Sequence, residues 1–385
     1  MSVEGWLKQS VKDICDLGRG RVISTQEIEL HTGIYPVFSS QSQDKGEMGK
    51  IDTYDFEGEY ITWTTDGAYA GTVFYRTGKF NCTNVCGTLK AKNRQLSMKF
   101  LAYKLSSLTK NYVSYVGNPK LMNNVMANIE LSLPESQAEQ TQIATILSTI
   151  DRAIEQTEAL ITKQQRIKTG LMQDLLTKGI DENGNIRSEE THKFKDSPLG
   201  RIPVEWEVKE IGKVASLQRG YDIREIDFLP GNFPVIASSG IIGFHKFRTS
   251  IGPNVVVGRK GSIGNVYYIG LDFWAHDTSL FVTNFFGNHE RYIYYLFVYL
   301  ELERFGTKSG SPSLNRNDIH PLLVSIPNPN EQIEIARIIY NCDELLTTLS
   351  KELEKNKLQK TGLMQDLLTG KVRVTDLLNQ KTATN

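Results

Sequence analysis

A repeated nonapeptide constrains the fold of this chain more than any other feature. The sequence TGLMQDLLT occurs at Thr169–Thr177 and again, 192 residues later, at Thr361–Thr369. At the same spacing Glu139-Gln140 is repeated as Glu331-Gln332, and no gap separates these pairs from the nonapeptides. Self-similarity at a fixed spacing is the signature of a repeated structural unit. We therefore interpret the 385-residue chain as a tandem duplication in which one fold is used twice.

The duplication extends upstream into two longer and more divergent segments. The positions that correspond there are Trp6 and Trp206, Arg19-Gly20 and Arg219-Gly220, Pro36-Val37 and Pro234-Val235, and Leu133-Pro134 and Ile326-Pro327. Each copy is thus a divergent globular part followed by a tail that the two copies share closely. The length of the chain agrees with two or three domains.

Both tails carry a heptad pattern, in which every fourth and then every third residue falls on one seam. In the first copy the seam is Ile143, Leu147, Ile150, Ile154, Thr157, Ile161, Gln164, Lys168, Leu171 and Leu175. In the second copy it is Ile335, Ile339, Cys342, Leu346, Leu349, Leu353, Asn356, Lys360, Leu363 and Leu367. So narrow an apolar seam needs a partner helix, which predicts an intramolecular two-helix coiled coil. The connectivity leaves both parallel and antiparallel pairing open.

Two consecutive positions of each seam are polar, Gln164 and Lys168 in the first copy and Asn356 and Lys360 in the second, and a glycine follows two residues later in each helix. A polar residue on a seam fixes the register of a coiled coil, or it forms a docking surface for a partner. The candidate docking residues are Gln164, Lys168, Gly170, Met172, Asn356, Lys360, Gly362 and Met364. Glycine weakens a helix interior, so we expect either a bend there or a separate short helix that begins at the threonine of the nonapeptide.

The globular parts are predicted to be mixed α+β. Runs rich in β-branched and aromatic residues, such as 60–63 and 254–257, predict strands, whereas Phe100–Leu108 and Glu290–Phe305 predict helices. We assign globular parts to residues 1–138 and 204–330, helical regions to 139–178 and 331–370, a linker to 179–203 and a polar tail to 371–385.

Charge is distributed unevenly, although the 44 basic and 44 acidic residues balance. The three stretches 67–129, 228–271 and 304–317 contain no Asp or Glu, and each carries lysines and arginines. Local positive potential of this kind is typical of a polyanion-binding face. The alternative is that these cations are solvated and meet acidic partners from other segments.

Sequence signals for catalysis are absent. The chain has no G-x4-G-K-[ST] phosphate loop and no H-E-x-x-H motif, and its six histidines are scattered. We interpret the four cysteines as reduced thiols of a cytoplasmic protein, and we expect no metal site, no membrane segment and no secretory leader. A duplicated, locally basic chain without an active site fits a reader of two half-sites in duplex DNA.

Candidate DNA-reading residues are polar, basic or aromatic and lie in the divergent loops. In the first globular part these are Ser39, Ser40, Lys45, Thr65, Tyr69, Asn84, Asn118 and Lys120. In the second they are Ser238, Ser239, His245, Lys246, Arg248, Arg259, Lys260, Ser262, Ser311, Asn315 and Arg316. Gly258–Gly264 predicts a tight hairpin from which Arg259 and Lys260 project.

The sequence resembles the specificity (S) subunit of type I restriction–modification systems. The resemblance covers nearly the whole chain, and it is carried by the run Pro198–Trp206, the two Glu-Gln helix starts and the twin nonapeptides. It implies two target recognition domains, at 1–138 and 204–330, joined by two helices in an antiparallel coiled coil with pseudo-two-fold symmetry. Each domain would read one half of an asymmetric bipartite site.

The resemblance also implies the partners. The helices would dock two methyltransferase (M) subunits, which use S-adenosylmethionine to methylate adenine, and restriction (R) subunits would add ATP- and Mg-dependent cleavage. A non-catalytic scaffold that binds only proteins is the alternative, and a self-sufficient endonuclease fails on the missing site. The first copy lacks the Pro-Leu-Gly-x-Ile-Pro run that precedes Trp206, which predicts that the tail after Thr369 lies near Trp6 and completes the first copy.

Overall fold

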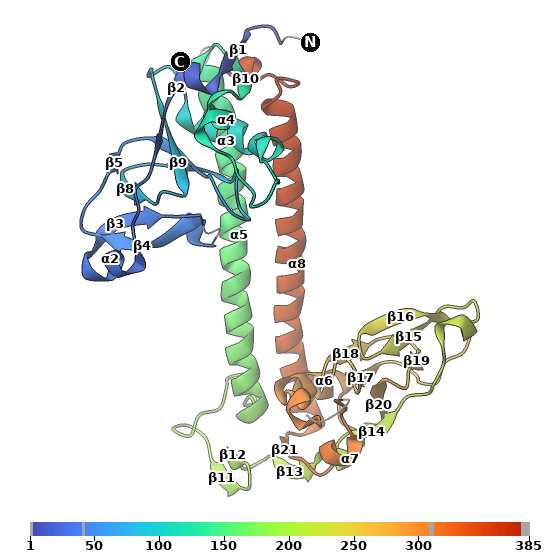
Figure 1. Cartoon of the computed structure of the whole chain (residues 1–385). Helices are drawn as coiled ribbons and strands as arrows, with labels where there is room; N and C mark the ends of the chain where they lie inside the picture. Colours follow the sequence, from blue (N-terminus) through green and yellow to red (C-terminus); the bar gives the residue numbers. More distant parts are fainter. Residues whose placement is uncertain (1–2, 41–42, 308–311, 379–385) are drawn as a thin grey trace. The chain divides into compact units, whose positions relative to one another are not determined.

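The computed structural model describes residues 3–40, 43–307 and 312–378, and the expected mixed α+β class is confirmed (Figure 1). Two long helices, α5 (Gln137–Thr177) and α8 (Pro329–Leu367), accompany two globular parts. The chain divides into two compact units, which we call unit 1 (Met1–Glu158 with Glu352–Asn385) and unit 2 (Ala159–Lys351). Each unit therefore holds one globular part together with residues of both long helices.

In the described part of unit 1, two four-stranded sheets and a two-stranded pairing form the globular part. The first sheet has the order β2 (Cys15–Arg19), β9 (Cys86–Ala91), β6 (Tyr60–Thr64), β7 (Val73–Arg76). The second has the order β4 (Glu47–Ile51), β3 (Thr32–Phe38), β8 (Lys79–Cys82), β5 (Phe56–Glu57). The remaining elements are β1 (Trp6–Ser10) paired with β10 (Glu130–Pro134), and α1 (Val11–Ile14), α2 (Thr25–Leu30), α3 (Met98–Ser106) and α4 (Asn123–Ala127).

Unit 2 repeats this plan within its described residues. One sheet has the order β14 (Ser216–Arg219), β20 (Ser279–Asn284), β17 (Asn254–Gly258), β18 (Val266–Ile269). Another has the order β16 (Gly240–His245), β15 (Phe233–Ala237), β19 (Trp274–Ala275). The remaining elements are the pairs β13 (Glu207–Glu210) with β21 (Leu323–Ile326) and β11 (Phe194–Ser197) with β12 (Gly200–Pro203), and the helices α6 (Glu290–Tyr299) and α7 (Arg316–Ile319).

The strand orders confirm that one fold is used twice. The order β2-β9-β6-β7 in unit 1 is the order β14-β20-β17-β18 in unit 2. An isolated antiparallel bridge joins Asp66 to Lys120 in unit 1, and Lys260 to Ser313 in unit 2. These bridges align the two loop regions position by position, which allows their side chains to be compared below.

Each core joins the globular part to both long helices. In unit 1 one apolar cluster contains Trp6, the early α5 residues Ile143 and Leu147, and the late α8 residues Leu367 and Leu368. Because the start of one helix packs beside the end of the other, the helices are antiparallel within this unit. The equivalent cluster of unit 2 contains Trp206, Leu175, Leu176, Ile335 and Ile339.

Both helices are continuous through their glycines. Gly170 lies within α5 and Gly362 within α8, and a Cβ added at either position would meet no other atom within 4 Å. The alternative of a separate short helix is therefore wrong, since the remaining i→i−4 bonds outweigh a cost of about 1 kcal/mol at one glycine. All twenty seam positions are buried or half-buried, as the heptad pattern predicts.

Two further expectations change. Residues 179–203, predicted to be a linker, contain the β11–β12 hairpin and the buried side chains of Ile180, Arg187 and Ile202, because this segment closes the core of unit 2. The predicted helix Glu290–Phe305 is shorter, since α6 ends at Tyr299 and Glu301 is left-handed (φ 48°).

The tail after Thr369 lies near Trp6, as predicted from the shortened first copy. Arg373 donates from Nη1 to the carbonyl of Glu4 at 2.6 Å. It also donates to both carboxylate oxygens of Glu139, at 2.6 and 2.7 Å. Val374 is buried in the same cluster as Trp6. The beginning and the end of the described chain thus complete unit 1 together.

Candidate nucleic-acid interface

Three arginines from separate loops of unit 2 line one pocket of about 290 Å3. Arg219 ends β14, Arg259 follows β17, and Arg316 begins α7. The pocket is also lined by Ser313 and Asn315 and by two leucines, Leu280 and Leu314. We call this cavity the arginine pocket. Three arginines that line one pocket create a local positive potential that attracts anions.

The arginines of this pocket differ in whether an acidic side chain pairs with them. Arg219 donates from Nη2 to Oδ2 of Asp277 at 2.7 Å, so this charge is paired. Arg259 donates from Nη1 only to the backbone carbonyl of Asp277, at 3.2 Å. Burial, together with the charge of Arg219, lowers the pKa of Arg259 from its usual value. Among the described residues, Arg219 is therefore the one of the three arginines that forms an ion pair.

The loop that carries Arg259 is a tight hairpin between β17 and β18, as predicted. Gly264 is left-handed (φ +76°), and a Cβ there would lie 2.4 Å from the backbone nitrogen of Glu303, so only glycine fits. The backbone N–H groups of Arg259 and Lys260 both donate to the carbonyl of Thr278. Lys260 projects into solvent as expected, whereas Arg259 is half-buried against the turn.

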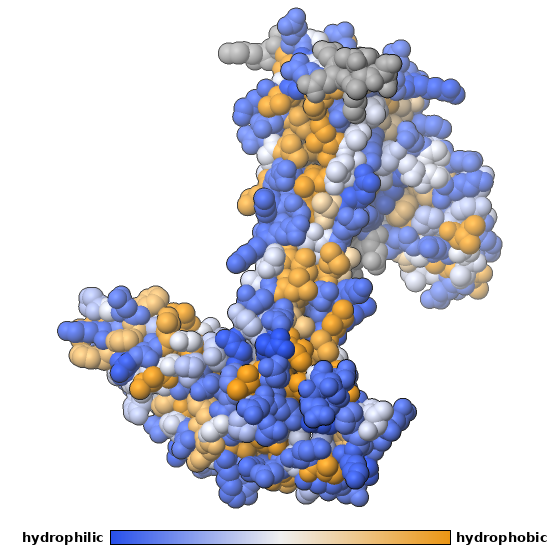
Figure 2. Space-filling model, turned by 180° about the vertical axis from the view of Figure 1, so that it is seen from behind, coloured by the Kyte–Doolittle hydropathy of each residue, from blue (hydrophilic) through white to orange (hydrophobic). Residues whose placement is uncertain are grey.

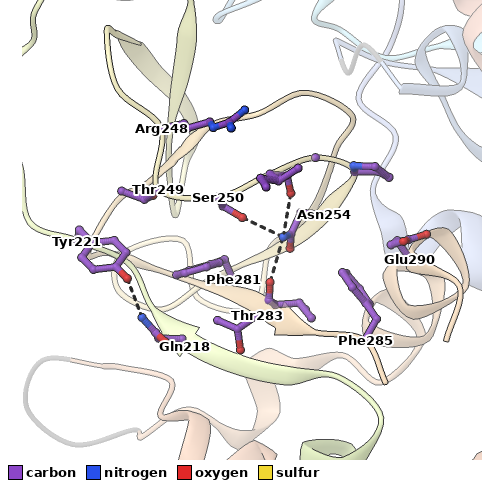
Figure 3. Close-up of a pocket in the computed structure, with 14 residues that line it drawn as sticks. Gln218, Tyr221, Arg248, Thr249, Ser250, Asn254, Phe281, Thr283, Phe285 and Glu290 are labelled. Carbon is purple, nitrogen blue, oxygen red and sulfur yellow. Dashed lines mark hydrogen bonds between the residues drawn. The ribbon is translucent and has the colours of Figure 1, made fainter. Parts of the chain in front are cut away.

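A second and larger pocket, of about 680 Å3, lies in the same unit (Figure 3). On one side Gln218 donates to the hydroxyl of Tyr221 at 3.0 Å. On the other Asn254 donates to Oγ of Ser250 at 2.9 Å and to two backbone carbonyls. Arg248 stands at its rim in an ion pair with Asp272. The wall is thus polar and already hydrogen-bonded internally.

The structure separates the predicted residues of unit 2 by exposure. The exposed ones are Ser239, Lys246, Arg248, Lys260, Asn315 and Arg316. Arg259 and Ser262 are half-buried, and Ser311 lies outside the described residues. Ser238 and His245 are buried. The carbonyl of Ser238 accepts a hydrogen bond from Tyr267, and Nδ1 of His245 accepts one from the N–H of Leu229. These two residues support the fold and present no side chain to a ligand.

Unit 1 gives a different distribution. Tyr69 and Asn84 are exposed, and Ser39 and Ser40 are half-buried. Thr65 is fully buried, which removes it as a reader. The exposed residues that already have acidic partners are Lys45 (with Glu155), Asn118 (with Asp66) and Lys120 (with Asp66).

The predicted docking residues on the helices also differ in exposure and in their contacts. Lys168 forms an ion pair with Asp343 at 2.5 Å in unit 2, and Lys360 forms one with Asp151 at 2.6 Å in unit 1. These lysines therefore act within the helix pairing of their own unit. Met172 is buried in the core. Gly170 and Gly362 are exposed, and Gln164, Asn356 and Met364 are half-buried.

Sequence reasoning missed Arg219 and its counterpart Arg19 as site residues. Arg19 donates from Nε to the carbonyl of Asn84 at 2.5 Å and from Nη2 to Oγ1 of Thr65 at 3.2 Å. Both arginines were recognised only as positions that the two copies share. The Arg-Gly pair that recurs at the end of one strand in each copy was the available signal.

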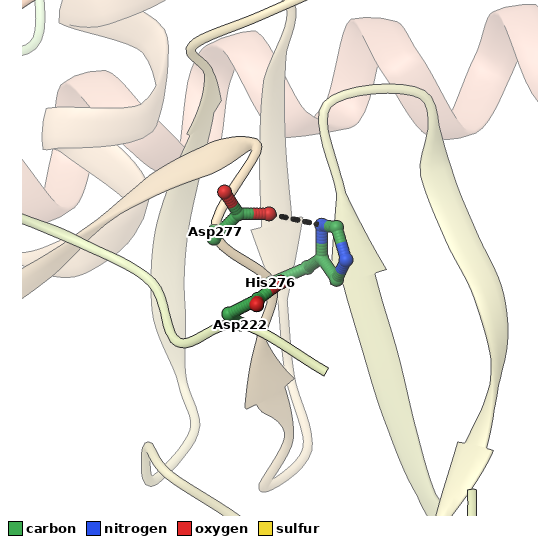
Figure 4. Close-up of side chains that lie close together, drawn as sticks. All are labelled: Asp222, His276 and Asp277. Atoms are coloured by element: carbon green, nitrogen blue, oxygen red, sulfur yellow. Dashed lines mark ion pairs between the residues drawn. The ribbon is translucent and has the colours of Figure 1, made fainter. Parts of the chain in front are cut away.

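One group of carboxylates and imidazole among the described residues has the spacing of metal ligands: Asp222, His276 and Asp277 (Figure 4). Two of the three residues are already engaged. Asp277 pairs with Arg219, and the ring of His276 bonds to Oγ1 of Thr278 at 2.8 Å and to the carbonyl of Ile223 at 3.2 Å. Asp222 is exposed, and protein contacts account for the positions of His276 and Asp277.

Comparison with known proteins places the chain in a family. A family model described as the type I restriction modification DNA specificity domain matches residues 3–164 and again 203–360. A Mycoplasma pneumoniae protein named as a type I specificity subunit is 33% identical over 334 residues, which is 85% of this chain and 86% of that protein. The type I restriction enzyme MpnII specificity subunit of the same organism is 47% identical over 143 residues, 37% of this chain and 43% of its own.

A solved structure agrees with the fold. The crystal structure of the type I restriction–modification S subunit from M. genitalium matches with a TM-score of 0.69 at 19% identity, over 95% of this chain and 99% of that one. The chain belongs to the family of type I restriction–modification DNA specificity proteins, which confirms the resemblance seen in the sequence. Among the described residues, no helix combines the length and apolarity needed to cross a bilayer.

Proposed function

We propose that the chain is the DNA-reading, non-catalytic subunit of a type I restriction–modification complex, and that each unit reads one half of an asymmetric bipartite site. The observation that carries this proposal is the arginine pocket, to which the acid-free stretches 228–271 and 304–317 contribute Arg259 and Arg316, on a duplicated fold of the specificity family. Recognition of duplex DNA requires basic groups that bind phosphates and side chains that reach base edges. The loops of unit 2 supply both kinds.

The two units differ where they would read DNA, which supports an asymmetric site. The aligned bridges place Arg259 and Lys260 of unit 2 at the positions of Thr65 and Asp66 in unit 1. A guanidinium and an ammonium group thus replace a buried hydroxyl and a carboxylate. Loops that differ in charge at aligned positions support two half-sites that differ in sequence.

The long helices are the proposed docking surface for two M subunits, with R subunits joining the assembly. Several large apolar side chains on these helices are exposed in spite of the buried seam: Leu160, Ile167, Leu345 and Leu358. Figure 2 shows hydrophobic surface along the helices. Exposed apolar surface of this kind marks protein interaction sites. S-adenosylmethionine would then bind to the M subunits and ATP to the R subunits. A complex that acts on DNA would work in the cytoplasm.

A genome-wide map of methyladenine in the source strain, with this gene intact and deleted, tests the proposal. We expect one asymmetric bipartite motif to lose its methylation on deletion and to regain it when the gene is restored. A strain that carries a frameshift early in the same gene is the control for polar effects on neighbouring genes. A scaffold that only binds proteins would leave the set of methylated motifs unchanged, and this result would refute DNA reading.

A further inference from the structure

The arginine pocket is concave, and its shape decides which part of a duplex it can receive. Base edges lie at the floor of a major groove about 8.5 Å deep, so side chains that protrude must read them. Phosphates project outward from the duplex and carry its negative charge, so they fit a basic hollow. The geometry of the pocket therefore favours a backbone phosphate over a base.

The charge balance of the pocket also favours a backbone phosphate. The carboxylate of Asp277 neutralises Arg219, which leaves Arg259 bonded only to a backbone carbonyl. Within the described part of the chain, no hydrogen bond or ion pair engages the side chain of Arg316, which is exposed. Neither Arg259 nor Arg316 forms an ion pair among the described residues, and one phosphodiester can accept hydrogen bonds from two guanidinium groups.

The backbone that carries Arg259 and Arg316 is held by hydrogen bonds. The backbone carbonyl of Arg259 accepts a hydrogen bond from the N–H of Leu314 at 2.9 Å. The backbone N–H of Arg259 donates to the carbonyl of Thr278 at 2.8 Å. The helix that begins at Arg316 is capped by Asn315, whose side chain accepts from the N–H of Asn317 at 3.0 Å. Little ordering of the backbone is left to occur on binding, which favours affinity.

Unit 1 does not contain the same pair. Thr65, at the position of Arg259, is buried, and Asn123, at the position of Arg316, donates to the carbonyl of Gly18 at 3.1 Å. Only the first arginine is common to both units, as Arg19 and Arg219. The basic pair is therefore a property of unit 2 and not of the shared fold.

We propose that Arg259 and Arg316 clamp one backbone phosphate of the half-site bound by unit 2 and so set the register of the duplex on that unit. The ion pair of Arg219 with Asp277 positions the backbone carbonyl that holds Arg259. This inference rests on the proposed function. It adds a prediction that the function alone does not make, because the phosphate clamp carries affinity without choosing sequence.

The test uses the full chain purified with its M subunits, and duplexes that carry either the methylated motif or a scrambled sequence of equal length. Fluorescence anisotropy gives Kd at several salt concentrations between about 50 and 200 mM. Arg316→Gln should weaken binding about tenfold, and equally on both duplexes. It should also reduce the slope of log K against log salt by about 1. Arg201→Gln, which removes an exposed guanidinium elsewhere in unit 2, is the control and should change neither quantity.

A single neutral methylphosphonate moved along the backbone gives a second, independent readout. At one position it should weaken the wild-type complex, while Arg316→Gln should lose nothing further there because the contact is already gone. If Arg316→Gln instead relaxes the choice of one base pair and spares the scrambled duplex, the pocket reads a base and the inference falls. Unchanged salt slopes also overturn it, while specific binding by the wild type leaves the proposed function standing. Failure of the wild-type complex to prefer the motif overturns both.

Discussion

Arg187→Met should destabilise unit 2 strongly, because it leaves a buried carboxylate without its cation. The side chains of Arg187 and Glu331 are 10% and 6% exposed and lie 2.5 Å apart. Arg187 donates from both terminal nitrogens to the two carboxylate oxygens. Gly179 (φ +64°) leaves the space for this pair, since a Cβ there would lie 2.1 Å from Glu331.

The magnitude follows from what remains after the substitution. Removing one partner of a buried ion pair costs about 3–5 kcal/mol in free energy of unfolding. The carboxylate of Glu331 would keep the N–H of Ile180, at 3.0 Å, and the indole N–H of Trp206, at 3.3 Å. These donors offset part of the loss, so we expect about 3 kcal/mol. The double variant Arg187→Met with Glu331→Gln should recover part of it, because no charge is then buried.

Urea unfolding monitored by tryptophan fluorescence measures this loss, since Trp206 contacts the altered carboxylate. The matched control is Arg201→Met, in the same unit. Arg201 and Glu189 also lie 2.5 Å apart, but their side chains are 48% and 57% exposed. An exposed pair contributes about 0–1 kcal/mol. Equal losses for the two variants would refute the reasoning that burial, and not distance, sets the energy.

Three further predictions follow from the same contacts. Truncation after Thr369 removes the arginine that pairs with Glu139, so limited proteolysis should cleave unit 1 faster and unit 2 at the wild-type rate. Asp343→Asn removes the charged acceptor of the hydrogen bond from Tyr295 and should lower the free energy of unfolding in urea by about 1.5–2 kcal/mol. Burial, assisted by the nearby charge of Arg316, lowers the pKa of His320. The unfolded chain therefore takes up a proton first as the pH falls below about 6.5, and stability present above that pH is lost. His320→Gln should flatten this dependence in thermal melts.

Each of these predictions has a result that contradicts it. Equal proteolysis of both units would show that the tail does not stabilise unit 1 in particular. A loss for Asp343→Asn no larger than that for the exposed Glu158→Gln, which pairs with Lys357 at 3.2 Å, would show that the hydrogen bond from Tyr295 adds nothing. A pH dependence that survives in His320→Gln would assign it to another group.

The long helices could be predicted from the sequence because their signal is local and duplicated. The heptad seam sets the buried face of each helix residue by residue, and the predicted ranges 139–178 and 331–370 agree with α5 and α8 to within a few residues. The direction of pairing could not be derived in this way. It depends on contacts such as Lys168 with Asp343, which join residues far apart in the chain.

The site was predicted less completely, because residue type does not reveal burial. His245 is polar and lies in a loop-rich, acid-free stretch, yet its ring is an internal hydrogen-bond acceptor. Thr65 is likewise buried, and its hydroxyl donates to the carbonyl of Val85. Arg219 was overlooked because it ends a strand, and only the folded sheet brings it beside Arg259 and Arg316.

The duplication keeps some residues identical and changes others, and the difference follows their position. Tyr103 donates to Asp151 in unit 1, and Tyr295 donates to Asp343 at 2.7 Å in unit 2, with a seam lysine paired to each aspartate. All three members of this arrangement recur at the same spacing of 192 residues.

The loop positions that form the arginine pocket have instead diverged between the copies. A frame that is the same in both units can hold two identical partners, whereas loops that differ can bind two different DNA half-sites. This division of roles explains why one chain would carry two copies of a fold with unlike surfaces. It also predicts that exchanging the loop residues of the two units would alter the DNA sequence that is read and leave the pairing of the helices intact.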